Sequence, residues 1–259
     1  MGISLVIRSS IHNCGKSVLS FLLVCKLSQV LRKDMSILVC CACMQHGGVI
    51  DMAGNAGGYP TLEDLVNAGI SSENNDADIK SLLYKSGEIY FIDSSKATPL
   101  FVKNNSAGYI GLMEFLKQQF DIIITDTSSA PENPLTQLTL ENCDHILDVA
   151  VQDIQMLQKS IQGNQKNLAY VINRYDNIYP DKNELSKLLK IKNIFTLPNC
   201  IQLQEMKNRN HLYQYAELHT DYMRAVGKLA DFLAKEQNLP KEERKSNRSF
   251  IQFLRKGDT

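Results

Sequence analysis

Short apolar segments alternate with helical patterns along the whole chain, and this alternation limits the possible fold more than any other feature of the sequence. Strand-like segments separated by helices are typical of a mainly parallel β-sheet whose crossover helices cover both faces. We therefore predict an α/β fold, a three-layer sandwich with a mainly parallel central sheet. Strands are expected at residues 3–9, 35–42, 88–93, 121–129, 145–151, 167–173 and 193–198, and helices at 16–32, 62–67, 108–119 and 220–237.

The length of 259 residues and the hydrophobic content of 44% suit one large domain. After the last predicted helix, Pro240 is followed by a run of charged residues that breaks the apolar pattern. We predict one domain over residues 1–239 and a basic, amphipathic tail over residues 240–259.

The first predicted strand leads into Gly15, Lys16 and Ser17, which open an apolar helix like the end of a phosphate-binding loop. Ser10 stands where the first glycine of G-x-x-x-x-G-K-[ST] belongs, so the motif is incomplete. A GKS tripeptide alone is weak evidence, because such a sequence often begins an ordinary helix. In a working loop, backbone N–H groups and the positive end of the helix bind phosphate. The candidate nucleotide-binding residues here are Asn13, Cys14, Gly15, Lys16, Ser17 and Val18.

A carboxylate stands at the end of the apolar segment DIIITD, where Asp126 follows four buried-type residues. At the carboxyl edge of a parallel sheet, such a group can hold Mg²⁺ beside a phosphate loop. An aspartate at a strand end also often serves only in a turn or a helix cap. Its combination with Gly15–Ser17 favours ATP and Mg²⁺ as cofactors, with Lys16 at the β- and γ-phosphates and Ser17 and Asp126 at the metal.

FDIIITDTSSAP (residues 120–131) resembles the second Mg²⁺ motif, yDyIIIDtpp, of the MinD/ParA group of P-loop ATPases. GYPTLEDLVNAG, ENCDHILDVAVQDIQMLQKS, YVINRYD and FTLPNCIQLQEMKNRN resemble further family segments, so the likeness covers most of the chain. The resemblance implies a P-loop NTPase fold and a face-to-face homodimer. It also implies that Asn173 hydrogen-bonds the adenine ring and that the loop after Pro198 closes over the base. A simple turn role for Asn173 remains the alternative.

Two departures from the family pattern bear on catalysis. The family loop reads K-G-G-x-G-K-[ST], but Ile11 replaces its first lysine, and His12 and Asn13 replace two glycines. Asparagine tolerates a left-handed backbone well, whereas His12 would adopt one at some cost in strain. The family also carries D-x-D after the second strand, where this chain has CCACMQ. Because a carboxylate that orients the attacking water is missing there, we expect ATP binding with slow or absent hydrolysis.

Seven cysteines, an odd number, are expected to be reduced thiols that behave as small apolar residues. Cys40, Cys41 and Cys43 suggest a metal site, but adjacent residues of a strand point to opposite faces of a sheet. The alternation therefore disfavours a three-cysteine metal site.

The divergent loop is similar to that of the TadZ/CpaE branch, whose members position pilus or secretion machinery. We expect a nucleotide-dependent dimeric factor that recruits a protein partner in a pilus, secretion, membrane or DNA-segregation system. A metabolic P-loop enzyme, such as a small-molecule kinase or synthetase, is the first alternative, and the glycine-rich residues 45–59 could hold its second substrate. A scaffold that binds no nucleotide is the second.

Charge and hydropathy limit the expected location and partners. Lysine plus arginine and aspartate plus glutamate each total 28, so the net charge gives no reason to expect nucleic-acid binding. No segment shows a signal-peptide pattern or a bilayer-spanning apolar run, so we expect a cytoplasmic protein. In the tail, Phe250, Ile251, Phe253 and Leu254 lie among basic residues. This segment suits peripheral contact with the inner face of the cell membrane, or docking on a partner.

Overall fold

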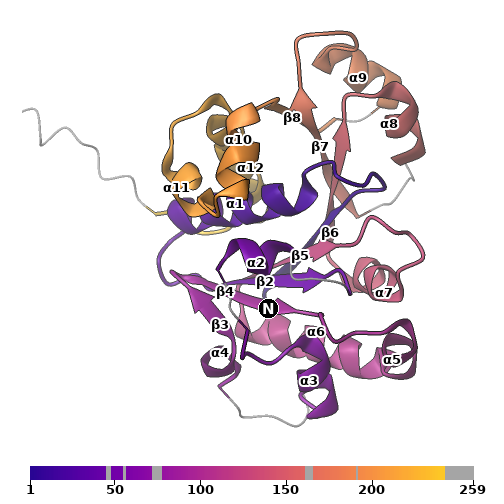
Figure 1. The fold of residues 1–259 in the computed structure, drawn as a ribbon, viewed down its shortest axis with the longest axis vertical. Coiled ribbons are helices and arrows are strands. Elements are labelled where there is room, and N and C mark those ends of the chain that lie inside the picture. Colours follow the sequence, from indigo (N-terminus) through magenta and orange to yellow (C-terminus); the bar gives the residue numbers. More distant parts are fainter. Residues whose placement is uncertain (45–47, 55–56, 72–77, 161–165, 191, 243–259) are drawn as a thin grey trace, which may run out of the picture.

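One eight-stranded sheet forms the centre of the computed structural model (Figure 1), which describes residues 1–44, 48–54, 57–71, 78–160, 166–190 and 192–242. The strand order is β3-β4-β2-β5-β1-β6-β7-β8, and every neighbouring pair except β3 and β4 is parallel. The predicted α/β sandwich is thereby confirmed. The strands are β1 (Ile3–Arg8), β2 (Ile37–Ala42), β3 (Tyr84–Ser86), β4 (Ile89–Asp93), β5 (Ile122–Thr127), β6 (His145–Val151), β7 (Asn167–Tyr175) and β8 (Ile194–Pro198).

Helices cover both faces of the sheet and complete the three layers (Figure 1). One apolar core joins the sheet to α1 (Lys16–Val30), α2 (Gly48–Met52), α11 (Leu212–Glu217) and α12 (Asp221–Glu236). On the opposite face, a second core joins it to α3 (Leu62–Asn67), α4 (Ile79–Leu82), α5 (Pro99–Asn104), α6 (Ser106–Gln119) and α7 (Pro134–Asn142). The remaining helices are α8 (Ile154–Ser160), α9 (Lys182–Leu189) and α10 (Ile201–Asn208).

Helix α1 is apolar around most of its circumference because it lies between the sheet and α2, α11 and α12. Phe21, Leu22 and Leu23 are successive residues, and all three are buried. Full burial of each such side chain stabilises the fold by about 1.5–3 kcal/mol. The helix is therefore fixed firmly along its length, and its amino-terminal end is held at the carboxyl edge of the sheet.

The parallel register brings the chemically active residues to that same edge. Asp126 on β5 is aligned with Ile7 on β1 and with Cys41 on β2. Because β1 lies between β5 and β6, the loop that leaves it emerges between the two halves of the sheet, where α/β proteins commonly bind ligands.

The structure differs from the sequence predictions mainly at element ends. Most expected strands shift by one or two residues, β7 extends to Tyr175, and the short antiparallel strand β3 was not predicted. Three tail residues contact the domain: Pro240 O accepts from Arg32 N at 3.1 Å, Lys241 pairs with Leu31, and Glu242 N donates to Val30 O at 3.0 Å. The apolar tail segment at residues 250–254 lies outside the described residues.

Candidate nucleotide and cation site

The loop between β1 and α1 forms a tight turn at the amino terminus of the helix. Asn13 and Gly15 both adopt left-handed backbone angles, with φ of 58° and 86°. Asparagine thus takes the conformation expected of it, and His12 needs no left-handed angle. No side chain caps α1, and its first turn has no acidic residue. Its free N–H groups and the positive helix end therefore suit an anion such as phosphate.

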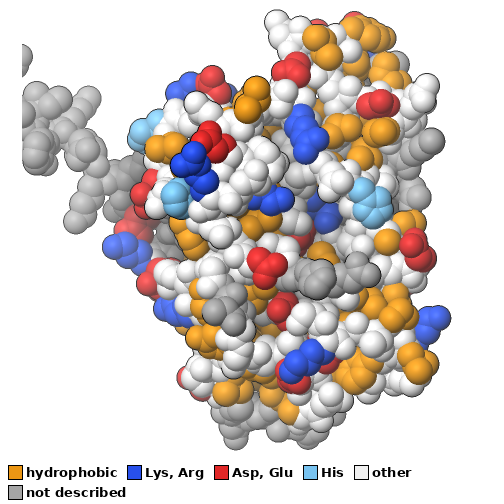
Figure 2. Space-filling model, in the orientation of Figure 1, with side chains coloured by type: hydrophobic (Ala, Val, Ile, Leu, Met, Phe, Trp, Pro, Cys, Tyr) orange, Lys and Arg blue, Asp and Glu red, His pale blue; other side chains and the backbone are white. Residues whose placement is uncertain are grey.

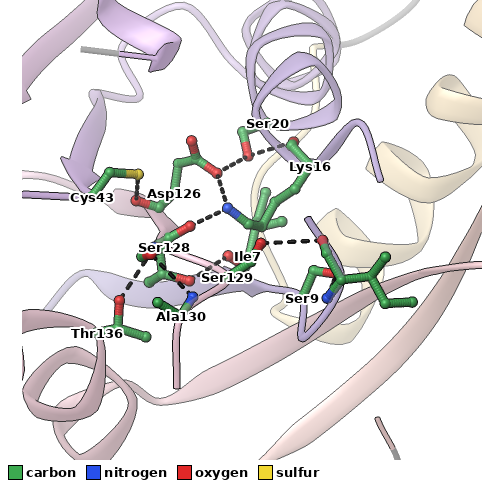
Figure 3. Close-up of polar contacts among 12 residues, drawn as sticks. Ile7, Ser9, Lys16, Ser20, Cys43, Asp126, Ser128, Ser129, Ala130 and Thr136 are labelled. Atoms are coloured by element: carbon green, nitrogen blue, oxygen red, sulfur yellow. Dashed lines mark hydrogen bonds and ion pairs between the residues drawn. The ribbon is translucent and has the colours of Figure 1, made fainter. Parts of the chain in front are cut away.

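Lys16, the first residue of α1, is buried and points toward the end of β5 (Figure 3). Its Nζ donates to the carbonyl oxygen of Thr127 and lies 3.4 Å from Asp126 Oδ1. Burial, the largest single effect, would by itself lower the pKa of Lys16. The charge of Asp126, smaller electrostatic effects of two nearby cysteines and the hydrogen bond with Asp126 together outweigh it, and the pKa is raised. The lysine therefore stays charged at the position where phosphates would meet the loop.

Asp126 is fully buried, and only one of its two carboxylate oxygens is satisfied. Oδ1 also accepts from Ser20 Oγ at 3.3 Å, whereas Oδ2 has no hydrogen-bond partner among the described residues (Figure 3). A Cβ placed on Gly48 would lie 3.7 Å from both Asp126 Oδ2 and Ser17 Oγ, so both oxygens border one small space. A carboxylate oxygen without a hydrogen-bond partner and a hydroxyl oxygen are ligands that suit Mg²⁺, so Asp126 and Ser17 fit the expected cation.

Asn173, at the end of β7, holds the phosphate loop from the other side. Its Nδ2 donates to Cys14 O at 2.7 Å, and its Oδ1 accepts from Arg174 N at 3.0 Å and Tyr222 Oη at 3.3 Å. The neighbouring Arg174 donates from Nη2 to Asn13 O at 2.9 Å. Asn173 therefore supports the backbone of the loop in this structure, in addition to the adenine contact that the resemblance implies.

A cavity of about 420 Å³ lies beside the loop, between β7, β8 and α10. Four residues predicted from the sequence line this cavity: Gly15, Val18, Asn173 and Pro198. Tyr222 and Lys207 also line it. The cavity continues directly from the helix terminus, and its volume is within the range of small-molecule sites. A base and ribose bound there would leave the phosphates at α1.

No cation stands at the position of the family's first loop lysine. Ile11 packs against the apolar cores instead, and its carbonyl oxygen accepts from Ser9 Oγ and Ser129 Oγ, each at 3.2 Å. Ile11 therefore adds no charge to the loop, and the charged residue at the start of α1 is Lys16.

The prediction for the three cysteines at the end of β2, Cys40, Cys41 and Cys43, needs a correction. Strand alternation does separate Cys40, which lies in the core of the opposite face, from Cys41. However, Cys43 lies on the same side as Cys41, and their sulfur atoms and an Asp126 oxygen lie within 4.8 Å of one another. A hydrogen bond with Cys43 and burial raise the pKa of Cys41 well above its ordinary value. The alternation of side chains along the strand thus excludes a metal site made of all three cysteines. It does not exclude one made of Cys41, Cys43 and Asp126.

Comparison with known proteins identifies the fold. No protein-family model matches the chain, and no curated protein sequence matches it either. Among solved structures, a ParA family ATPase from Chlorobium tepidum has a TM-score of 0.72 at 18% identity, covering 90% of this chain and 98% of that one. The chain has the fold of the MinD and ParA ATPases.

Two MinD structures show the same likeness. MinD from Pyrococcus horikoshii, solved with Mg-ADP, has a TM-score of 0.73 at 15% identity and covers 91% of this chain and 97% of that one. The Aquifex aeolicus MinC:MinD complex has a TM-score of 0.72 at 13% identity, and the match covers 90% of this chain and 96% of that one. The MinD/ParA-like resemblance inferred from the sequence is thus confirmed at the level of the fold, over nearly the full length of each relative.

The surface offers no large area of one charge on the face that Figure 2 shows. Lysine, arginine, aspartate and glutamate side chains are interspersed there with hydrophobic ones. This distribution agrees with the zero net charge of the sequence. In the described part of the chain, no helix is both long and apolar enough to span a bilayer.

Sequence reasoning missed several contacts of the site. Ser20 lies one helical turn after Lys16, so the spacing on α1 could have revealed it. The contacts of Thr127 O and Tyr222 depend on β5 and α12, which are more than 90 residues from the loop in the sequence. No local pattern indicates those two contacts.

Proposed function

We propose that this chain binds ATP with Mg²⁺ and acts as a nucleotide-dependent homodimer that recruits a partner complex in a positioning system. One observation carries the proposal: the uncapped terminus of α1, charged Lys16 and the unpaired Asp126 oxygen converge beside a cavity of about 420 Å³. The terminus and Lys16 match the phosphates of a magnesium nucleotide, the unpaired oxygen matches the metal, and the cavity matches the base.

In this arrangement the loop amides and Lys16 bind the phosphates, and Ser17 and Asp126 hold the metal. Bound Mg²⁺ would neutralise charge on the phosphate oxygens and orient them. The cavity between Asn173 and Pro198 receives the base. Lys16 then contacts phosphate at the expense of part of its contact with Thr127 O, which couples nucleotide binding to the end of β5.

The positioning role rests on the relatives. One MinD structure contains Mg-ADP, and another is a complex with the cell-division protein MinC. By analogy, this chain would present a partner-binding surface when it holds nucleotide. A pilus or secretion complex, as in the TadZ/CpaE branch, is the partner class that the divergent loop favours.

Calorimetric titration with ATP and Mg²⁺, followed by sizing with and without nucleotide, tests the proposal. We expect saturable binding and a nucleotide-dependent increase from monomer to dimer. Absence of binding at millimolar ATP would favour the non-binding scaffold. Binding without any change in size, together with rapid turnover of an added second substrate, would favour a metabolic enzyme.

Hydrolysis should be slow or undetectable. Ile11 supplies no charge, and thiols replace the acidic groups after β2. Loss of one transition-state contact commonly lowers kcat about 10²- to 10³-fold, so we expect turnover below about 0.1 per second, against a median of about 10 per second for enzymes. Phosphate release by purified protein measures it, with Lys16→Ala as the background. Turnover near the median would show that other residues supply the catalytic groups.

The tail should contribute to attachment and not to folding. Because residues 240–242 contact the domain, a truncation that ends at Glu242 keeps these contacts and removes only residues 243–259. We expect this truncation to retain its melting temperature and ATP binding but to lose sedimentation with anionic liposomes. Four apolar side chains that are only partly buried at an interface give a few kcal/mol, so two tails in a dimer would bind far better than one.

Full-length protein and Phe250→Asp complete the comparison, since the substitution places a charge among the apolar residues of the tail. Equal sedimentation of all three proteins would remove the membrane role. A truncation that fails to fold would place the tail within the domain.

A further inference from the structure

We propose that Cys41, Cys43 and Asp126 form a binding site for a thiophilic divalent cation of the Zn²⁺ class, and that this site fills without nucleotide. Among the described residues, their ligand atoms lie within 4.8 Å of one another at the carboxyl edge of the sheet. The inference goes beyond the nucleotide function, because it concerns an ion that the two thiols and Asp126 bind when no nucleotide is present.

The sheet register determines which side chains meet. Cys41 on β2 and Asp126 on β5 are aligned residues of neighbouring parallel strands, so their side chains lie on the same face. Cys43 comes two residues later and returns to that face, where its Sγ lies 3.6 Å from Asp126 O. The three ligands thus come from two adjacent strand ends that the hydrogen-bonded sheet holds in place.

The spacing of these atoms is close to the spacing that a tetrahedral ion requires. Zn–S bonds of about 2.3 Å place two sulfur ligands about 3.8 Å apart in a tetrahedral site. Contraction from a limit of 4.8 Å needs a shift of about 1 Å, which rotation of the Cys43 side chain can supply. Three protein ligands leave a fourth position open, toward Ser17 Oγ and Gly48.

Charge explains why a dication belongs there. Two thiolates and a carboxylate carry three negative charges, and Lys16 offsets one of them. Cys41 and Asp126 are buried, so the free-energy cost of keeping the remaining two charges there would be prohibitive unless a divalent ion neutralised them. A metal ion bound by thiolates takes the place of thiol protons, so metal binding releases protons. Thiolate ligands favour Zn²⁺ or Co²⁺ over Mg²⁺.

Cobalt titration of the reduced full-length protein without nucleotide tests the proposal. We expect one Co²⁺ per chain, with the intense thiolate-to-cobalt absorption of a tetrahedral site, and its loss when Zn²⁺ displaces Co²⁺. Cys41→Ser and Cys43→Ser should each weaken Zn²⁺ binding by more than about 100-fold, since loss of an outer-shell partner alone costs about 10- to 100-fold. Cys41→Asp with Cys43→Asp should remove the thiolate absorption and shift preference toward Mg²⁺.

Cys143→Ser is the matched control, because Cys143 is a buried thiol beside Leu140 at the opposite edge of the sheet. It should bind Zn²⁺ like the unmodified protein. Equal Zn²⁺ affinity in all four variants, or cobalt spectra without a thiolate band, would overturn the proposal. Circular dichroism and a separate ATP titration of each variant distinguish this failure from misfolding and from failure of nucleotide binding.

Discussion

Replacement of Lys16 by alanine should abolish measurable ATP binding. Its Nζ is the cation that lies between the end of β5 and the terminus of α1, where the loop amides converge. Charge-assisted contacts are worth about 1.5–3 kcal/mol each, so the loss of contacts to two phosphates should weaken binding at least about 100-fold. Calorimetric titration with ATP and Mg²⁺ measures the change directly.

The alanine also leaves the buried Asp126 without its opposite charge, so the variant should melt at a lower temperature. Lys16→Arg separates the two effects, because it keeps the charge but cannot place a compact ammonium among the phosphates. It should fold more stably than Lys16→Ala and still bind ATP weakly. Lys26→Ala, on the same helix with an exposed contact to Gln29, is the control and should bind normally. Undiminished binding by Lys16→Ala would refute the phosphate-loop assignment.

Substitution of Gly15 by alanine should have the second-largest effect. A Cβ there would lie 2.4 Å from Asn173 Nδ2, and the φ of 86° is unfavourable for alanine. Asn173 has little freedom to retreat, since Cys14, Arg174 and Tyr222 all hydrogen-bond it. We expect a loss of about 1–3 kcal/mol in unfolding free energy and at least a tenfold loss in ATP affinity. Denaturant unfolding and calorimetry measure these quantities.

Gly227→Ala is the matched control for this substitution. Gly227 lies inside α12 with no atom within 4 Å of an added Cβ, so alanine there should leave stability unchanged or raise it by up to about 1 kcal/mol. A double-mutant cycle with Asn173→Ala tests the cause. If the clash is responsible, the double variant loses less stability than the sum of the single variants. Strict additivity would leave backbone strain as the sole cause.

Much of the fold could be predicted because its signals are local. Apolar runs of strand length predicted seven of the eight strands. Strand β3 was missed because it has three residues, too few for a recognisable apolar pattern. The phosphate loop was visible for the same reason, since Gly15–Ser17 follows a strand and opens a helix within one short segment. Gly15 and Val18 were named from the loop motif, and Asn173 and Pro198 from the resemblance. The structure places all four on one cavity.

The sequence by itself therefore determined the layered α/β architecture, the helix terminus that suits an anion and the lysine and aspartate beside it. Only the tertiary structure decided which distant groups meet them. Strand pairing between β2 and β5 brings Cys41 and Cys43 to Asp126, although more than 80 residues separate them along the chain. Packing of α12 brings Tyr222 to Asn173. Side-chain periodicity gives the face on which a residue lies, but the order and register of the strands determine its neighbours, and these depend on contacts along the whole chain.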